Sequence, residues 1–100
     1  MSRYIIAPAA EEDLLVIWHY YAEELTDPEL ADRMIAEIIE GIHTIAGTPG
    51  IGHLRSDLSD EPLHFWGVRK YLIIYRAEKA PVEIVRVLHG ARDVQAILNP

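Results

Sequence analysis

The sequence contains no cysteine, only one phenylalanine and only two tryptophans among its 100 residues. Without cysteine, both a disulfide framework and a thiolate metal site are excluded. No apolar run approaches the length that spans a bilayer, and the apolar stretch after Arg3 is too short for a signal peptide. We therefore expect a cytoplasmic protein that does not enter a membrane, and the length fits a single domain over residues 1–100.

Basic residues are scarce in the first half of the chain. The net charge is −7, and residues 1–50 hold two basic residues against ten acidic ones. Residues 51–100 are near neutral, with seven basic and six acidic residues. Since a nucleic-acid-binding domain normally presents a basic face, we expect no direct DNA binding. Arginines concentrated in the second half of the chain could still contact a macromolecule other than DNA.

The spacing of apolar residues predicts a strand followed by a helical hairpin. The segment from Arg3 to Ala7 favours a short strand that Pro8 ends. Apolar residues then recur every three or four positions, first over residues 9–25 and then in a second segment that Gly47 and Pro49 end. The hairpin is expected to have acidic residues outside and aliphatic residues inside.

Two starts are possible for the second helix. Thr26 and Glu29 match a capping box, whereas Asp27 and Pro28 match an N-cap followed by proline at the first helical position. The sequence does not decide between them. Gly41 lies within this helix, where glycine costs roughly 1 kcal/mol relative to alanine.

Three strands are predicted in the second half, after a loop over residues 50–62. They cover Leu63 to Arg69, Tyr71 to Arg76 and Val82 to Leu88, with a turn around residues 79–81 before the third. Alternation places Ile73 with Tyr75 on one face, and Ile84 with Leu88 on one face of the last strand. A short helix from Arg92 to Leu98 would end the chain. The fold class is therefore α+β: the N-terminal strand joins a three-stranded antiparallel meander in one twisted sheet, and the hairpin covers one face.

Several segments, in this order and spacing, resemble the RelE/ParE superfamily of type II toxin–antitoxin systems, and more closely its ParE branch. The resemblance covers nearly the whole chain. The residues that carry it are Ala10-Glu11-Glu12-Asp13-Leu14 with Ile17 and Tyr20, then residues 45–52, Arg55-Ser56-Asp57-Leu58, residues 68–76, and residues 84–93.

The resemblance implies a compact domain with a twisted antiparallel sheet and a helical hairpin. It implies a toxin that is bound in a hetero-oligomer by a ParD-like antitoxin encoded beside it. In the ParE branch the implied action is inhibition of DNA gyrase. In the RelE branch it is cleavage of messenger RNA on the ribosome. A third possibility is a diverged member that still forms the antitoxin complex and has lost its toxicity.

If the protein were a ribonuclease, Arg69, Arg86, His89 and Arg92 would be the candidate catalytic residues. Metal-free RNA cleavage needs cations for the phosphate charge and a group that exchanges a proton, which arginine and histidine supply. For two of these residues, a structural role is the alternative to catalysis. Arg86 lies in an apolar run, where an arginine is usually paired with a carboxylate, and His89 before Gly90 suits a turn. We therefore favour a binding inhibitor without catalysis.

The candidate partner-binding residues are Trp66, Tyr71, Tyr75 and Arg76. Aromatic residues and arginine dominate the energetics of protein interfaces. The alternative is that these side chains pack the core, which is favoured for Tyr75. We expect the tail of the antitoxin to fold over the toxin as a helix in a groove or a strand at a sheet edge. No cofactor is expected, and the scattered histidines predict no metal site.

Overall fold

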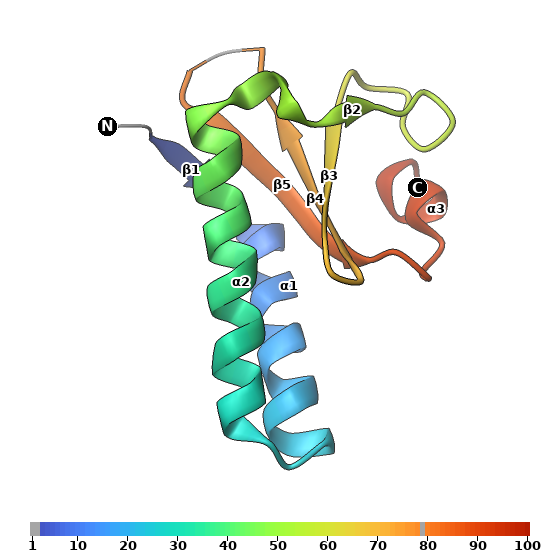
Figure 1. Cartoon of the computed structure of the whole chain (residues 1–100). Helices are drawn as coiled ribbons and strands as arrows, with labels where there is room; N and C mark the ends of the chain where they lie inside the picture. Colours follow the sequence, from blue (N-terminus) through green and yellow to red (C-terminus); the bar gives the residue numbers. More distant parts are fainter. Residues whose placement is uncertain (1–2, 79) are drawn as a thin grey trace.

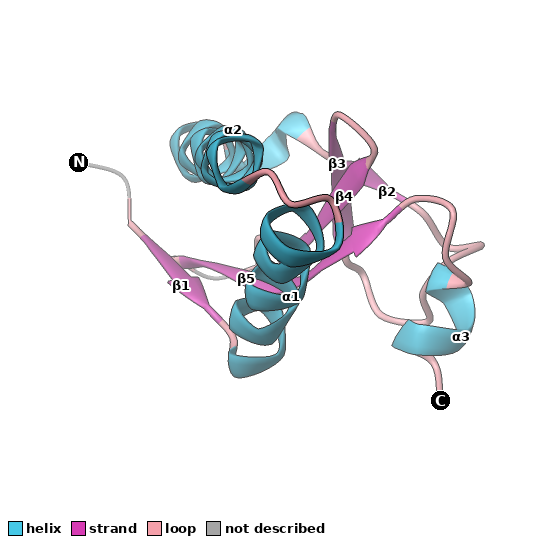
Figure 2. Ribbon diagram, turned by 90° about the horizontal axis from the view of Figure 1, so that it is seen from below, coloured by secondary structure: helices cyan, strands magenta, loops and turns pink. Residues whose placement is uncertain are grey.

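A computed structural model of the chain describes residues 3–78 and 80–100. It contains one helical hairpin that packs across one face of a five-stranded sheet, and a short C-terminal helix on the opposite side (Figures 1 and 2). Residue 79, part of the predicted turn before the last strand, lies outside the described residues, as do residues 1 and 2. The predicted α+β architecture is confirmed. No helix among the described residues is long and apolar enough to cross a membrane.

The hairpin is formed by α1 (Pro8–His19), a π-helical turn (Tyr20–Glu24) and α2 (Pro28–Gly47). Asp27 is the N-cap of α2, and its carboxylate accepts a hydrogen bond from the backbone N–H of Leu30 at 3.0 Å. Pro28 therefore occupies the first helical position, so the second of the two predicted starts is the one that forms. The π-turn extends the first helix almost to Leu25, where the apolar spacing ends.

The sheet has the strand order β1-β5-β4-β3-β2. Its strands are β1 (Tyr4–Ile6), β2 (His53–Leu54), β3 (His64–Val68), β4 (Tyr71–Arg76) and β5 (Val82–His89). Two features correct the expectation. First, β1 joins the sheet as predicted but runs parallel to β5, so the sheet is mixed. Second, β2 forms within the segment predicted as a loop, because residues 53–54 pair with β3.

A β-bulge in β5 changes which residues share a face. Ile74 pairs with Arg86 and Tyr75 pairs with Ile84, so Val85 is an extra residue without a partner. An extra residue reverses the alternation of side chains beyond it. The prediction that Ile84 and Leu88 share a face is therefore wrong: Ile84 packs beneath the hairpin, and Leu88 lies on the opposite face.

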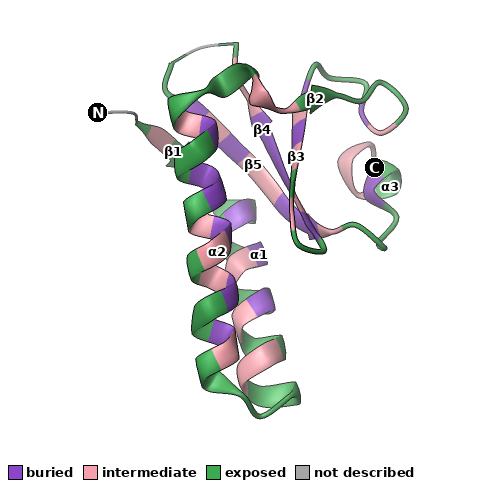
Figure 3. Ribbon diagram, viewed as in Figure 1, coloured by how far each residue is buried: buried purple, intermediate pink, exposed green. Residues whose placement is uncertain are grey.

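The two faces of the sheet carry separate apolar clusters, as the apolar pattern of β5 on both faces predicted. Ile73 and Tyr75 lie together under the hairpin, as expected. The opposite cluster is closed by α3 (Val94–Leu98), which begins two residues later than predicted. Figure 3 shows buried residues along the inner side of α2 and along the central strands, whereas much of α1 is exposed.

Close packing explains the glycine in the middle of α2. A Cβ atom on Gly41 would lie 2.6 Å from Cγ2 of Val68 and 3.1 Å from Cδ1 of Ile73. A larger residue at position 41 would therefore require the side chains of β3 and β4 to shift.

Candidate functional site

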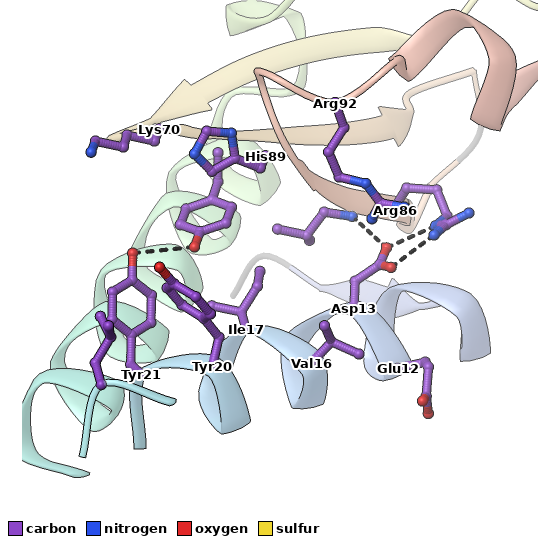
Figure 4. Close-up of a pocket in the computed structure, with 13 residues that line it drawn as sticks. Glu12, Asp13, Val16, Ile17, Tyr20, Tyr21, Lys70, Arg86, His89 and Arg92 are labelled. Atoms are coloured by element: carbon purple, nitrogen blue, oxygen red, sulfur yellow. Dashed lines mark hydrogen bonds and ion pairs between the residues drawn. The ribbon is translucent and has the colours of Figure 1, made fainter. Parts of the chain in front are cut away.

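A pocket of about 660 Å³ opens between the hairpin and the ends of β4 and β5 (Figure 4). The hairpin contributes mainly apolar and aromatic side chains, and the strand ends contribute the basic ones. Its lining residues are Glu12, Asp13, Val16, Ile17, Tyr20, Tyr21, Leu25, Lys70, Tyr71, Arg86, Val87, His89 and Arg92.

One end of the pocket is formed by an ion pair between the buried Asp13 of α1 and the partly buried Arg86 of β5. Both oxygens of Asp13 accept hydrogen bonds from the Arg86 guanidinium, at 2.8 Å from Nε and 2.8 Å from Nη2. Asp13 is 7% exposed, and it also accepts the backbone N–H of Val87 at 2.9 Å. The hydrogen bond to Asp13 raises the pKa of Arg86. Arg86 is therefore paired with a carboxylate, as its apolar surroundings in the sequence predicted.

Three tyrosines form the aromatic part of the pocket. The buried Tyr71 donates its hydroxyl hydrogen to the hydroxyl of Tyr21 at 3.2 Å, and Tyr20 packs edge-on against Tyr21. Burial, followed by the hydrogen bond to Tyr21, raises the pKa of Tyr71 well above its ordinary value of 10.0. The ring of Tyr71 also meets His89 edge-on at 5.5 Å between centroids. The Tyr71 phenol is therefore neutral at physiological pH.

Two further basic side chains line the pocket: Arg92 lies beside Arg86, and Lys70 lies at the opposite end (Figure 4). Lys70 and Arg92 have no carboxylate within 4.0 Å among residues 3–78 and 80–100. The backbone N–H of Gly90 donates to the carbonyl of Lys70 at 2.8 Å, which connects the two strand ends. His89 Nδ1 accepts the N–H of Ala91 at 3.0 Å, so the neutral ring carries its proton on Nε2. His89 thus has the predicted turn role and also faces the pocket.

Only part of the candidate ribonuclease set is brought together. Arg86, His89 and Arg92 line the pocket, but Arg69 lies in the turn between β3 and β4 and does not. Arg69 donates from Nε and Nη2 to the two oxygens of Glu37 on α2, at 2.6 and 2.8 Å. Within the described part of the chain, Lys70 and Arg92 therefore line the pocket without a carboxylate partner, whereas Arg86 is bound to Asp13.

The four predicted partner-binding residues are also dispersed. Tyr71 lines the pocket, whereas Tyr75 is 0% exposed; its hydroxyl donates to the carbonyl of Pro49 at 2.7 Å and accepts the N–H of Gly52 at 2.9 Å. Burial raises the pKa of Tyr75. Trp66 is partly buried against the cluster beneath the hairpin. Arg76 pairs with Glu61 at 3.0 Å and with Glu83 at 3.2 Å.

Sequence reasoning missed the contribution of the first helix to this pocket. Val16, Tyr20 and Leu25 are exposed and line it. The available signal was that apolar residues occur on more than one side of this helix. A helix that is apolar on two sides has two surfaces to cover.

A second apolar depression lies on the outer side of the hairpin. It has a volume of about 350 Å³ and is lined by Glu11, Leu14, Leu15, Trp18 and Ile35. Trp18 donates its indole N–H to Asp32 on α2 at 2.9 Å, which joins the two helices there. We call this depression the outer groove. It has acidic neighbours and no cation in its lining, unlike the pocket at the strand ends.

A helical hairpin that covers one face of a five-stranded mixed sheet defines a small α+β domain, and a pocket and a groove flank its first helix. The family model for the ParE toxin of the type II toxin–antitoxin system parDE matches residues 4–94. The chain therefore belongs to the ParE toxin family, as the sequence resemblance predicted.

Solved structures with the same fold include the following one. It is a chain of a chromosomal ParDE toxin–antitoxin system from P. aeruginosa, with a TM-score of 0.73 and 21% sequence identity. The similarity covers 89% of the present chain and 96% of that chain. No curated protein matches the sequence.

Proposed function

We propose that this toxin arrests growth by binding DNA gyrase in the cytoplasm, and that a ParD-like antitoxin neutralises it in a hetero-oligomeric complex. One observation carries the proposal: exposed apolar side chains of α1 line both the pocket and the outer groove. Contiguous exposed apolar surface usually marks an interaction site. We choose DNA gyrase and a ParD-like antitoxin as the partners because the chain belongs to the ParE family.

Two features of the site support inhibition by binding rather than by catalysis. The Arg86 guanidinium is held by Asp13, so its charge is already neutralised and its donors are turned toward α1. Arg69 binds Glu37 away from the pocket. A phosphate entering the pocket would therefore meet only part of the charge that RNA cleavage needs.

The proposal is tested with purified toxin in a gyrase supercoiling assay, run beside a ribosome-programmed messenger RNA cleavage assay. We expect supercoiling to be inhibited and the messenger RNA to stay intact. Expression in cells should arrest growth with DNA damage signalling, and co-expression of the antitoxin should restore growth. Supercoiling at the untreated rate, at toxin in excess over gyrase, would refute gyrase as the target.

Ribosome-dependent cleavage is the second candidate, favoured by the position of Arg86, His89 and Arg92 around one pocket. It predicts cuts in messenger RNA within minutes of expression, and loss of toxicity in His89→Ala with the fold retained. A third outcome, no growth defect at all, would identify a member that only forms the antitoxin complex.

A further inference from the structure

The outer groove is an apolar surface on the acidic hairpin. All of its lining residues belong to α1 and α2, and the hairpin extends well beyond the sheet (Figure 1). We propose that the groove receives a basic segment of the target protein: an apolar side chain of that segment contacts Leu15 and Trp18, and its lysines or arginines lie beside Glu11 and Asp32. The inference rests on the proposed function and specifies which surface of the toxin holds the target and what chemistry the target presents there.

The apolar part of the argument comes from side chains that the fold leaves uncovered. Leu15 is 56% exposed, and Leu14, Trp18 and Ile35 are half-buried around it. The indole N–H of Trp18 already binds Asp32 at 2.9 Å, so the rest of the ring offers apolar surface to a partner. Contiguous apolar surface of this kind usually marks an interaction site.

The charge around the groove determines which partner fits it. Residues 8–47 contain ten acidic residues and a single arginine, Arg33, which does not line the groove. Glu11 and Asp32 are both exposed, and neither has a lysine or arginine within 4.0 Å among residues 3–78 and 80–100. The groove therefore attracts a segment that carries positive charge.

The same charge disfavours other occupants of an exposed helical groove. Nucleic acid and anionic lipid surfaces are negatively charged and would be repelled. A second copy of this chain would bring an equally acidic hairpin. A protein that acts on DNA, in contrast, presents lysine and arginine to the phosphates. The proposed target, DNA gyrase, is such a protein, so charge complementarity favours the target as the occupant.

The outer groove and the pocket can be altered independently. They lie on different sides of α1 and have no lining residue in common. A substitution at Leu15 therefore leaves the side chains that line the pocket unchanged. The effect of groove variants on the target can accordingly be separated from any effect at the pocket.

The first test measures the affinity of the full-length toxin for intact gyrase by calorimetry. Glu11→Lys replaces attraction by repulsion and should weaken binding by about tenfold. The matched control is Glu40→Lys, the same change of charge at an exposed position of α2 outside the groove. This control should bind within about twofold of wild type.

Salt provides a readout that a purely structural effect would not change. The Debye length falls from about 30 Å to about 3 Å between about 0.01 and 1 M salt. The difference in affinity between Glu11→Lys and wild type should therefore shrink as salt rises. Thermal melting of each variant establishes that the fold is retained.

The apolar contact is tested with Leu15→Ala, which should weaken binding to gyrase by about fivefold or more, as truncation of a central contact does. The matched control is Leu54→Ala, which truncates a residue that is 60% exposed on β2 and lies outside the groove. This control should bind as wild type does.

The absence of cysteine permits a direct test of the partner's chemistry. Leu15→Cys places the only thiol of the chain in the groove. A reagent that joins a thiol to an amine should then link the toxin to lysines of gyrase, and mass spectrometry identifies the segment. Leu54→Cys, outside the groove, should give no such link. Links from Leu54→Cys but not from Leu15→Cys would overturn the inference.

The outcomes separate this inference from the proposed function. If wild type binds and inhibits gyrase and both Glu11→Lys and Leu15→Ala do so equally well, the inference is overturned and the proposed function stands. If wild type neither binds nor inhibits gyrase, the proposed function fails and the inference falls with it. If these variants keep their affinity for gyrase but lose affinity for the antitoxin encoded by the adjacent reading frame, the groove belongs to the antitoxin and the inference is overturned.

Discussion

The hairpin is joined to the sheet by two arginine–carboxylate pairs that have the same geometry and opposite surroundings. Arg86 and Asp13 connect β5 to α1, and Arg69 and Glu37 connect the β3–β4 turn to α2. Each arginine donates two hydrogen bonds to one carboxylate. The side chains of the first pair are 25% and 8% exposed, and those of the second are 62% and 31% exposed.

Water makes these two contacts energetically different. A buried carboxylate that loses its partner keeps an uncompensated charge, whereas an exposed one is solvated again. Asp13 additionally accepts the backbone N–H of Val87, which lies within the sheet. We therefore infer that the α1 side of the hairpin depends on its ion pair, and that the α2 side depends on close packing at Gly41.

The largest expected effect follows from removal of the buried carboxylate. Asp13→Ala leaves Arg86 and the Val87 N–H without a partner, and should lower the free energy of unfolding by about 3–5 kcal/mol in chemical denaturation. The double variant Asp13→Ala/Arg86→Met removes the stranded charge as well and should recover part of the loss. If the single variant were as stable as wild type, the α1 side of the hairpin would not depend on its ion pair.

Gly41→Ala tests the packing on the α2 side. Helix propensity alone predicts stabilisation, but the added Cβ would lie 2.6 Å from Val68 Cγ2. Overpacking should therefore destabilise the protein by about 1–3 kcal/mol in chemical denaturation.

Two further variants separate packing from propensity at this position. Adding Val68→Ala to Gly41→Ala should recover part of the stability, because the clashing methyl group is gone. Ala36→Gly, at an exposed position of α2, should cost about 1 kcal/mol through propensity alone. Stabilisation by Gly41→Ala would show that the helix does not approach the sheet as closely as described.

Tyr71→Phe removes a smaller contact on the α1 side, the hydrogen bond to Tyr21. It should cost about 0.5–1.5 kcal/mol at neutral pH. Because burial raises the pKa of Tyr71, the folded protein holds its proton after the unfolded chain has lost it above pH 10.0. Stability should therefore fall as pH rises above 10.0, and the fall should be shallower in Tyr71→Phe. Equal alkaline slopes in both proteins would exclude this group as the cause.

The smallest effect is expected at the exposed pair. Arg69→Ala should leave the thermal midpoint close to that of wild type, because solvent screens the contact. Arg69 lowers the pKa of Glu37 below its ordinary value of 4.5. Its contribution is thus present above pH 4.5 and is lost as pH falls through the lowered pKa. Glu37→Gln should slightly flatten the acid dependence of the midpoint. If the thermal midpoint of Arg69→Ala fell as far as that of Asp13→Ala, the exposed ion pair would contribute as much stability as the buried one.

Local patterns in the sequence predicted the order of the elements well. The two helices, the three central strands and the terminal helix follow from apolar spacing and from turn residues, which act over a few positions. The choice between two starts for α2 depended on a single cap and was left open. The strand β2 was missed because its two residues have no pattern of their own and form only by pairing with β3.

The candidate site was predictable only in part. The paired state of Arg86 was foreseen from its apolar surroundings, but its partner was not, because Asp13 lies 73 positions earlier. Arg69 could not be separated from the other arginines by residue type. Its distance from the pocket follows from the turn in which it lies and from the position of Glu37 on α2.

The sequence by itself determined the α+β class, the acidic hairpin and the membership in the ParE family, because these depend on period, composition and the order of segments. The tertiary structure alone decided that β1 runs parallel to β5, that a bulge moves Leu88 to the far face, and that Lys70 and Arg92 line the same pocket. Such contacts join residues that are far apart in the chain. They exist only after the packing of the hairpin on the sheet has determined which side chains share a space.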